Sequence, residues 1–494
     1  MELFFLIATV LAIAAAAIYA WSKTGPRNIP PGPQGLPFFG NIFSLGQYPH
    51  KVLAEWKDKY GDVMSFKNGH RLMIVLSDPA TVRKVFANDV VANRDNQSAI
   101  RTDPGTSAEL GLVFSEGELW KSHRRFALST LRDLGMGKNW LEDTIITEVQ
   151  ELCDILRSTK GKAIYPKVQV TNSIANVICA LIFGRRFTLD DPKFTRLTAL
   201  LNELPTGLAA DSVVQALPFL MWFPNAVRKR VSAARQSLHS VFAFLREEVV
   251  QHTGTVDKQA DAPDYLYAYL AECENGSKTG GASSFTEEQL LPSLLDLFGA
   301  GTETTSNTTL WAFVYMLANP EIMKKVQLEI DERVGRDRML RSSDRNLLPY
   351  TEAMIMEVQR LGNLATFGLP HRNAEEITID GFTIPKDSNI LANLYSIHTD
   401  PRWFKEPFKF DPTRFLDANE KLIKPDGFMP FSTGKRVCLG EALAKMELFL
   451  FIANLLRCFT LQLPSGVKSV SLDAAPDSVV NSPVPFQVAF IPRV

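Results

Sequence analysis

Helical periodicity is the feature that most narrows the folds open to this chain. From about Gln47 onward, apolar residues recur every three to four positions, the spacing that gives a helix one buried face. The clearest such segments are residues 143–157, 171–183, 225–250 and 320–334. Strand-like patterns are confined to short runs at residues 63–67, 71–76, 377–384, 388–394 and 469–492. The sequence therefore predicts a mainly α fold with small β-sheets, and Asp380-Gly381 predicts a hairpin turn in the third of these runs.

The N-terminal segment differs from the rest. Residues 3–21 form an uncharged apolar run that is long enough to span a bilayer at about 1.5 Å per residue. Glu2 stands where a cleaved signal peptide would carry basic residues, and basic residues follow the run instead, which places the body on the cytosolic side. We therefore expect a transmembrane signal anchor at residues 1–22, with a cleaved signal peptide as the alternative. The stretch PPGPQGLPFFGN favours a stiff, proline-rich hinge over residues 23–46.

Two later segments are predicted to lie outside the main helices. Residues 255–284 hold the most loop-like stretch, which we expect to connect two helices across the surface. Residues 217–224 (LPFLMWFP) are apolar and bounded by proline, so they form either a core-facing turn or a patch that dips into a bilayer interface. The chain carries 53 Lys and Arg against 54 Asp and Glu, a net charge of -1, which argues against nucleic acid as the main partner.

A long apolar helix is predicted at residues 285–318, where Thr286 and Gln289 form a capping-box start. Its middle, AGTETT with a preceding glycine, contradicts that prediction locally, because each glycine in a helix interior costs about 1 kcal/mol relative to alanine. Glu303 beside Thr304 would supply a carboxylate and a hydroxyl suited to relaying protons. The alternative is a packing kink where glycine lets another group approach, and this motif alone does not decide between the two.

Cys438, in FSTGKRVCLG, is the unusual member of five cysteines. Cys153, Cys179 and Cys458 lie in apolar helical settings and are expected to be core thiols. Cys438 instead has glycine and basic neighbours. No CxxC pair or disulfide framework is present, and no His and acid partner stands at a recognisable spacing, so a disulfide or a nucleophile is disfavoured. A buried core residue and a ligand to a group that the sequence does not encode both remain open at this point.

Two shorter motifs place charged side chains on one helix face. Trp120 and Arg124 (WKSHR) are four apart, which puts an indole N–H and a guanidinium side by side, as suits a ligand with a carboxylate; a surface helix with a half-buried Trp is the alternative. Glu357 and Arg360 (EVQR) are three apart and share a face, which is a common arrangement of solvated pairs.

Together these motifs resemble the cytochrome P-450 family of haem-thiolate monooxygenases, in particular its animal microsomal, family-two branch. FSTGKRVCLG fits the haem-binding signature FxxGxRxCxG, AGTETT fits the oxygen-activating helix, and EVQR with DPTRF fits the buried charge triad. WKSHR, GEALAKMELFLF and FGRRF extend the likeness over essentially the whole chain. The resemblance implies the cytochrome P-450 fold, a triangular prism of helices around a buried haem, with residues 47–494 as the catalytic domain.

The resemblance also assigns roles to individual residues. Cys438 would be the axial thiolate ligand of the iron of haem (heme b, iron protoporphyrin IX), covered by Phe431. Thr304 and Glu303 would be the alcohol–acid pair, and Ala300 would lie beside bound O2. The haem propionates would be held by Arg436, Trp120, Arg124, His371 and Arg94. Gly434 and Gly440 would let the backbone approach the porphyrin without a Cβ clash. The charge triad would consist of Glu357, Arg360 and Arg414.

The implied activity is insertion of one oxygen atom from O2 into an apolar small molecule of xenobiotic, steroid or fatty-acid type. Electrons would come from NADPH through a flavoprotein reductase, with cytochrome b5 as a second partner, at the endoplasmic reticulum membrane. The reductase would dock on a basic surface made by Lys121, Arg125, Arg132, Lys138, Lys435 and Lys445. The substrate pocket would be lined by residues 96–113, 200–210, 291–300, 364–369 and 478–482, with Asp296, Asn363 and Asn481 as polar anchors. The alternatives are an isomerase or dehydratase of a peroxide substrate, and a non-catalytic haem-binding protein.

Overall fold

The computed structural model describes residues 9, 28–95, 98, 100, 110–135, 139–189, 191–255, 263–278, 284–476 and 480–493. Helices dominate these residues and the strands are short, which confirms the predicted fold class. The α-helices are α2 (Pro49–Tyr60), α3 (Pro79–Phe86), α4 (Gly117–Asp133), α5 (Asn139–Ser158), α6 (Lys167–Phe183), α7 (Pro192–Ala216), α8 (Ala226–Thr255), α9 (Tyr265–Lys278), α10 (Glu287–Ala318), α11 (Pro320–Arg333), α12 (Pro349–Gly362), α13 (Leu394–His398) and α14 (Glu441–Cys458). The strands are β1 (Val63–Asn68), β2 (Arg71–Leu76), β3 (Asn93–Arg94), β4 (His371–Arg372), β5 (Ile377–Ile379), β6 (Phe382–Ile384), β7 (Asn389–Ala392), β8 (Phe459–Gln462) and β9 (Ala489–Pro492).

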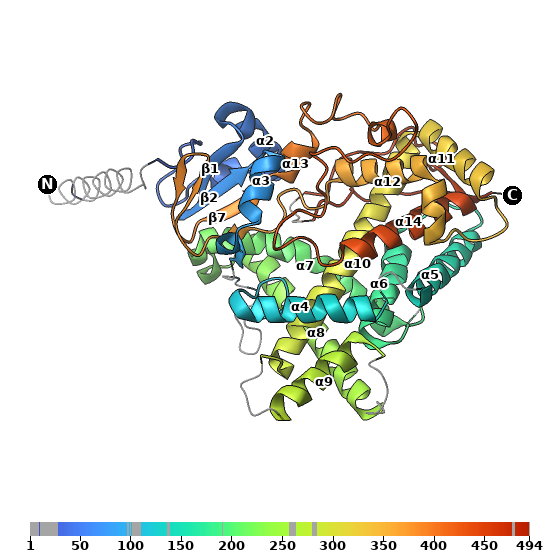
Figure 1. Ribbon diagram of the computed structural model, residues 1–494, viewed down its shortest axis with the longest axis horizontal. Coiled ribbons are helices and arrows are strands. Elements are labelled where there is room, and N and C mark those ends of the chain that lie inside the picture. Colours follow the sequence, from blue (N-terminus) through green and yellow to red (C-terminus); the bar gives the residue numbers. More distant parts are fainter. Residues whose placement is uncertain are drawn as a thin grey trace.

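The largest sheet has the strand order β1-β2-β7-β4-β3. β1 and β2 form an antiparallel hairpin, whereas β2 pairs with β7 in parallel, so segments more than 300 residues apart meet through Ile74 opposite Ile390. The predicted β5–β6 hairpin turns at Asp380 and Gly381, which have φ of 48° and 84°, the left-handed values that a tight turn of this kind requires. Figure 1 shows this sheet with α2 and α3 at one end of the molecule and the helical part at the other.

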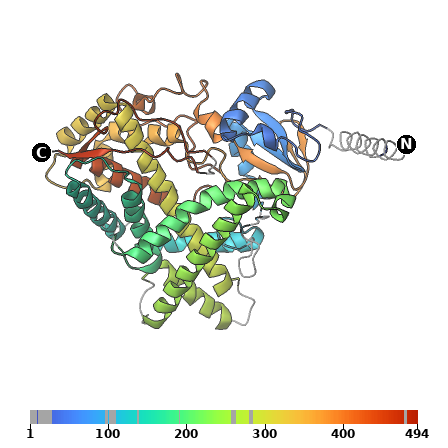
Figure 2. The same ribbon diagram turned by 180° about the vertical axis from the view of Figure 1, so that it is seen from behind.

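Helix α10 is the centre of the helical part. It packs against α6, α8, α12 and α14, and nearly all of its side chains from residue 289 to residue 317 are buried. Figures 1 and 2 both show α10 crossing the middle of the molecule, from the α8 and α9 end toward α12. Because neighbouring helices surround α10 along its length, the apolar run predicted a core element correctly, and polar residues in its middle therefore face the interior.

Two predictions about the helices were wrong. Residues 255–284 are not a loop throughout, because α9 lies among them. Its first turn is capped by the Asp264 carboxylate, which accepts the N–H of Tyr267 at 2.8 Å, and the rings of Tyr265 and Tyr269 are fully buried against the core. These aromatic residues recur at helical spacing, and that signal outweighs the polar composition that follows them.

The start of α10 is only half of a capping box. Thr286 caps the helix by accepting the N–H of Gln289 at 3.2 Å. The Gln289 side chain does not return to Thr286; it accepts the N–H of Gly111 at 2.9 Å and donates to its carbonyl at 3.2 Å. The side chain thus holds a second segment of chain against α10 instead of closing the helix end.

The expected membrane anchor at residues 1–22 lies, apart from Thr9, outside the described residues. Within the part of the chain that the structure describes, no helix has the length and apolar character needed to cross a bilayer.

Candidate functional site

Cys438 lies in the loop that enters α14, three residues before its first residue, as predicted. Its backbone N–H donates to the Phe431 carbonyl at 3.1 Å, which closes the loop on itself. The side chain is accessible to solvent although protein surrounds it, so the thiol faces interior space rather than the outer surface. Burial raises the pKa of the Cys438 thiol, while a hydrogen bond from the Gly440 amide and the charge of Arg124 act in the opposite direction. An ionised sulfur here would need a further positive charge, such as a metal ion.

Three arginines from separate elements converge near this loop: Arg94 from β3, Arg124 from α4 and Arg436 from the loop itself. Each is oriented by backbone carbonyls, since Arg94 donates to Leu369 O at 2.7 Å, Arg124 to Val437 O at 2.5 Å and Arg436 to Ser115 O at 2.6 Å. The Arg436 guanidinium also stacks on the indole of Trp120, 3.8 Å from the ring centroid.

These arginines form a cationic cluster without a carboxylate. Burial and mutual repulsion lower the pKa of Arg436 to about 8 and that of Arg94 to about 9. Among the described residues, no acidic side chain lies within ion-pair distance of any of the three. Buried arginines are normally paired, so this cluster is the kind of site that an anionic ligand completes.

Two orphaned polar atoms point to the same conclusion. Trp120 Nε1 and Arg94 Nε are buried and have no hydrogen-bond partner. A buried N–H without a partner is rare and costs about 1–3 kcal/mol. A flat ligand with carboxylates, bound between the accessible thiol of Cys438 and the cationic cluster, would satisfy these groups, so the residues present fit a haem with its propionates.

His371 is held by two contacts in the main sheet. Nδ1 lies 2.8 Å from the Val91 carbonyl, and the ring stacks on Phe86 with centroids 3.8 Å apart. Burial, together with the charge of Arg94, lowers the pKa of His371 to about 2, so the ring is neutral. In the tautomer that donates from Nδ1 to Val91, only Nε2 remains for a ligand.

The structure gives Gly434 a further reason that the sequence did not indicate. Gly434 has φ of 78°, and a Cβ there would lie 2.1 Å from the Phe86 carbonyl oxygen, so the glycine permits contact with the end of α3. The neighbouring Lys435 N–H donates to the same carbonyl at 3.0 Å. A Cβ on Gly440 would meet no atom within 4 Å, which leaves that position open to a ligand. Phe86 itself was missed, because the sequence marks it only as an apolar residue at a helix end.

The middle of α10 combines a packing role with an accessible face. A Cβ on Gly301 would lie 2.6 Å from Ile178 Cδ1, so this glycine brings α6 close, as the packing alternative predicted. Ala300 is exposed and Thr304 is half-buried on an otherwise buried helix. The Thr304 hydroxyl donates to the Ala300 carbonyl at 2.7 Å, and the helix nevertheless runs without a break.

Glu303 does not bond to Thr304. Its carboxylate instead accepts from Asn307 Nδ2 at 2.7 Å, and Tyr165 and Lys167 lie close enough for Glu303 to interact with them electrostatically. Burial raises the pKa of Glu303, so the carboxyl group holds a proton more strongly than an exposed glutamate does. The structure therefore places the predicted acid and alcohol on adjacent residues of α10, with different partners.

The predicted charge triad is assembled in the core. Arg360 Nε lies 2.6 Å from Glu357, and Arg414 Nε lies 3.0 Å from the same carboxylate. Arg360 also donates to the carbonyls of His398 and Pro407, each at 2.7 Å. Glu357 and Arg360 are both fully buried, so this pair is not the solvated surface pair that was the alternative.

Of the three predicted polar anchors of the pocket, Asp296 and Asn481 have structural partners, whereas the buried Nδ2 of Asn363 has no hydrogen-bond partner. The Asp296 carboxylate accepts the N–H groups of Leu112 at 2.7 Å and Val113 at 2.9 Å. Asn481 donates to the Gly362 carbonyl at 2.7 Å, and Asn363 is buried at the end of α12 with φ of 39°. Asp296 thus fastens the segment before α4 onto α10, which the sequence could not indicate. Parts of the expected pocket lining, at residues 96–97, 99, 101–109 and 478–479, lie outside the described residues.

The basic surface predicted around the loop is partly neutralised. Lys121 pairs with Glu118 at 2.8 Å, Lys435 with Asp89 at 3.3 Å and Lys445 with Glu441 at 2.7 Å. Arg132 and Lys445 line a shallow depression of about 560 Å³ together with Leu128, Arg345, Leu439, Glu441 and Ala442. Lys138, the remaining predicted member, lies outside the described residues.

The chain is similar to known proteins along nearly its whole length. The family model described as Cytochrome P450 matches residues 30–490. The chain is 36% identical to Cytochrome P450 2B19 of Mus musculus over 485 residues, which is 96% of this chain and 97% of the relative. It is 35% identical to Cytochrome P450 2B4 of Oryctolagus cuniculus over 491 residues, 98% of this chain and 99% of the relative. It is also 35% identical to Cytochrome P450 18a1 of Drosophila melanogaster, with 90% of this chain and 84% of the relative covered.

Proposed function

The chain belongs to the cytochrome P-450 family and is a haem-thiolate monooxygenase, and from this premise we propose how its own residues hold the haem and serve the reaction. Cys438 would bind the iron through its sulfur. Arg94, Arg124 and Arg436 would bind the propionates, assisted by Trp120 Nε1. The observation that carries this assignment is the convergence of an accessible thiol with a buried cationic cluster that has no carboxylate.

The bound haem would supply the redox chemistry, in which electron donation from the thiolate favours cleavage of the O–O bond. The protein's contribution is to hold the group, exclude water and deliver protons. Thr304 would present its hydroxyl on the accessible face of α10, next to Ala300. Glu303, whose pKa is raised by burial, would supply protons to Thr304 through solvent. Phe431, at the start of the Cys438 loop, would cover the sulfur and limit the access of water to it.

The assignment is tested by haem binding rather than by turnover. Apoprotein titrated with iron protoporphyrin IX and with its dimethyl ester should prefer the free acid strongly, because only the free acid brings two carboxylates to the arginines. In Arg436→Gln the preference should shrink by about tenfold or more, since a charge-assisted hydrogen bond contributes about 1.5–3 kcal/mol. Equal binding of the acid and the ester by the wild type would contradict the assignment.

Electrons reach the family's members from NADPH through a reductase. We infer that this reductase docks on the basic surface beside the Cys438 loop, where Arg125 and Arg132 complement the three paired lysines. Cytochrome b5 would share that surface. Residues 47–494 would form the catalytic domain, anchored to the endoplasmic reticulum membrane by residues 1–22 through the hinge at residues 23–46.

The patch at residues 217–224 supports contact with lipid beside that anchor. Its 3-10 helix, Pro218–Trp222, and the following residue expose the rings of Phe219, Trp222 and Phe223, which are 39%, 75% and 60% exposed. Aromatic rings exposed together on a loop favour a membrane interface. The substrate class remains an apolar small molecule of xenobiotic, steroid or fatty-acid type, since two of the three predicted polar anchors, Asp296 and Asn481, are occupied by backbone contacts.

A further inference from the structure

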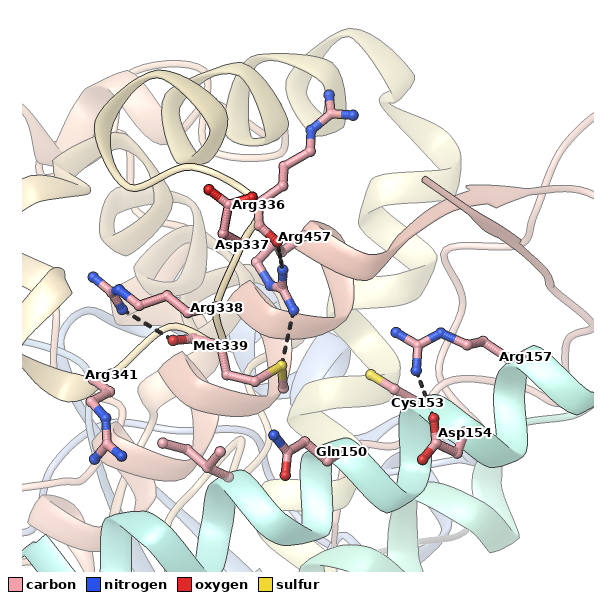
Figure 3. A pocket seen from close by; sticks show the side chains of 11 residues that line it. Gln150, Cys153, Asp154, Arg157, Arg336, Asp337, Arg338, Met339, Arg341 and Arg457 are labelled. Atoms are coloured by element: carbon pink, nitrogen blue, oxygen red, sulfur yellow. Dashed lines mark hydrogen bonds and ion pairs between the residues drawn. The ribbon is translucent and has the colours of Figure 1, made fainter. Parts of the chain in front are cut away.

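A second pocket lies far from the Cys438 loop. It has a volume of about 620 Å³ and is enclosed by α5, the turn that follows α11 and the C-terminal end of α14. Figure 3 shows its lining, which is dominated by long basic side chains from three sides. The 18 residues of α14 separate this pocket from the Cys438 loop by roughly 27 Å at about 1.5 Å per residue, so it is not part of the site above.

Arg457 is the exceptional cation of this pocket. Four arginines of the lining have carboxylate partners, in the pairs Arg157–Asp154, Arg336–Asp331, Arg338–Asp344 and Arg341–Asp143. Among the described residues, Arg457 has none within ion-pair distance. It donates instead to the Arg336 carbonyl at 2.5 Å and toward Met339 Sδ at 3.0 Å (Figure 3), and its Nε has no hydrogen-bond partner.

Two guanidinium groups approach a single sulfur at this point. Arg457 Nη2 lies 3.6 Å and Arg157 Nη2 lies 3.8 Å from Cys458 Sγ. Arg157 comes from α5 and Arg457 from α14. Because both donors are positively charged, this arrangement stabilises the thiolate form of Cys458. The charges that face Cys458 from the packed elements are those two arginines, of which Arg157 is paired with Asp154. Arg493, directly after β9, and Asp331 of α11 pair with each other nearby at 2.6 Å.

Cys153 is the second thiol of the cluster. It lies on α5 one turn before Arg157, whose guanidinium contacts Cys458 Sγ. Cys153 lines the pocket, and in Figure 3 its sulfur points into the space between Arg157 and Met339. The interaction between the two thiols raises the pKa of Cys153 and, together with the two arginines, lowers the pKa of Cys458 to about 6. The two sulfurs therefore differ in role: the Cys458 thiol loses its proton more readily than an ordinary thiol, whereas the Cys153 thiol holds its proton and reaches the pocket.

We propose that Cys153 and Cys458 form a peroxide-sensitive thiol pair, in which hydrogen peroxide entering the arginine-lined pocket joins α5 to the end of α14 by a disulfide. The Cys458 thiolate attacks one peroxide oxygen, the O–O bond breaks, and hydroxide leaves and takes up a proton. The resulting sulfenic acid is attacked by the Cys153 sulfur, an S–S bond forms and water leaves. In total, two thiols and one H2O2 give one disulfide and two waters.

The other thiols of the chain provide controls. Burial raises the pKa of Cys179 well above its usual value and that of Cys273 to about 11, so neither is ionised at neutral pH. Cys179 is fully buried on α6. Cys179→Ser therefore removes a core thiol without touching the pair, and Cys153→Ser and Cys458→Ser each remove one member of it.

The test treats ferric holoenzyme with H2O2 and measures the disulfide by peptide mass spectrometry, while haem absorbance shows that the protein remains intact. We expect a Cys153–Cys458 cross-link, with loss of two hydrogens, in the wild type and in Cys179→Ser, and none in Cys153→Ser or Cys458→Ser. The cross-linking rate should reach half of its maximum near pH 6, where Cys458 ionises. An ordinary thiol would place that midpoint at about 8.5.

Three results would overturn the proposal: no cross-link in folded wild type, a midpoint at the ordinary value, or a cross-link that uses another cysteine. Because a serine in place of a buried cysteine changes the packing around it, far-ultraviolet circular dichroism and haem content accompany each measurement. Arg457→Gln provides an independent check, since loss of one guanidinium should move the pH midpoint upward while leaving both cysteines in place. An unchanged midpoint in that variant would also count against the proposal.

Discussion

The buried charge triad gives the most quantitative prediction. In Glu357→Gln the side chain keeps its shape but loses its charge, so the fully buried Arg360 and its neighbour Arg414 lose the only carboxylate they share. Wild-type Glu357 accepts two bonds from Arg360 at 2.6 and 2.8 Å, one from Arg414 at 3.0 Å and one from the Asp411 N–H at 2.9 Å. The new amide group would turn two N–H donors toward a guanidinium.

Removing one partner of a buried ion pair costs about 3–5 kcal/mol, because the remaining charge is left in the core. That is a large share of the 5–15 kcal/mol by which a typical domain is stable. Glu118→Gln is the matched control: Glu118 pairs with Lys121 at the same i,i+3 spacing, at 2.8 Å, but its side chain is 88% exposed. An exposed pair contributes about 0–1 kcal/mol.

The measurement is urea unfolding of the two variants and of the wild type, followed by far-ultraviolet circular dichroism. We expect the Glu357→Gln midpoint to fall sharply, or the variant not to retain haem, while Glu118→Gln stays close to wild type. If the free energies of unfolding of the two variants differ by less than about 1 kcal/mol, the reasoning from burial is refuted.

Three further outcomes are expected. Burial raises the pKa of Glu447 to about 8, so the folded state still holds a proton at pH values where the unfolded state has released it. The free energy of unfolding should therefore fall by up to about 1.4 kcal/mol per pH unit as the pH rises from 4.5 to 8. Unfolding experiments on Glu447→Gln should show a flatter pH dependence. In protein lacking residues 1–22, Trp222→Ser should weaken binding to phospholipid vesicles by about tenfold, whereas Phe408→Ser, at a ring that is 71% exposed elsewhere, should not. Replacing Arg132 and Lys445 by Gln should slow reduction by the reductase by roughly a few fold and weaken its salt dependence; an unchanged rate at low and high salt would rule out docking there.

Local patterns predicted most of the elements. The helix predicted at residues 143–157 is observed as Asn139–Ser158, and the strand predicted at residues 71–76 is observed as Arg71–Leu76. Such elements can be predicted because the periodic pattern of buried residues lies within one continuous stretch of sequence. The burial of Cys153 and Cys458 was also predicted correctly, since both lie in apolar helical surroundings. Motifs of fixed spacing located the Cys438 loop and the triad.

Contacts between distant segments could not be predicted in the same way. Asp296 binds the backbone of residues 112 and 113, and the Phe86 carbonyl requires a glycine at position 434. Both contacts depend on which loops meet after folding. Glu447 gave no signal either: its Oε2 accepts from the Thr305 hydroxyl at 3.1 Å, joining α14 to α10, yet in sequence it is one acidic residue in an apolar helix. The proximity of Cys153 to Cys458 belongs to the same class.

The most direct test of the central claim is the absorption spectrum of the ferrous–CO complex of wild type and Cys438→Ser, prepared with matched haem content. Thiolate ligation by Cys438 predicts the red-shifted Soret band in the wild type and its loss in the serine variant. Cys458→Ser, which removes a thiol with a lowered pKa at the far end of α14, should keep the band. A red-shifted band that persists in Cys438→Ser would show that another residue ligates the iron and would contradict the account.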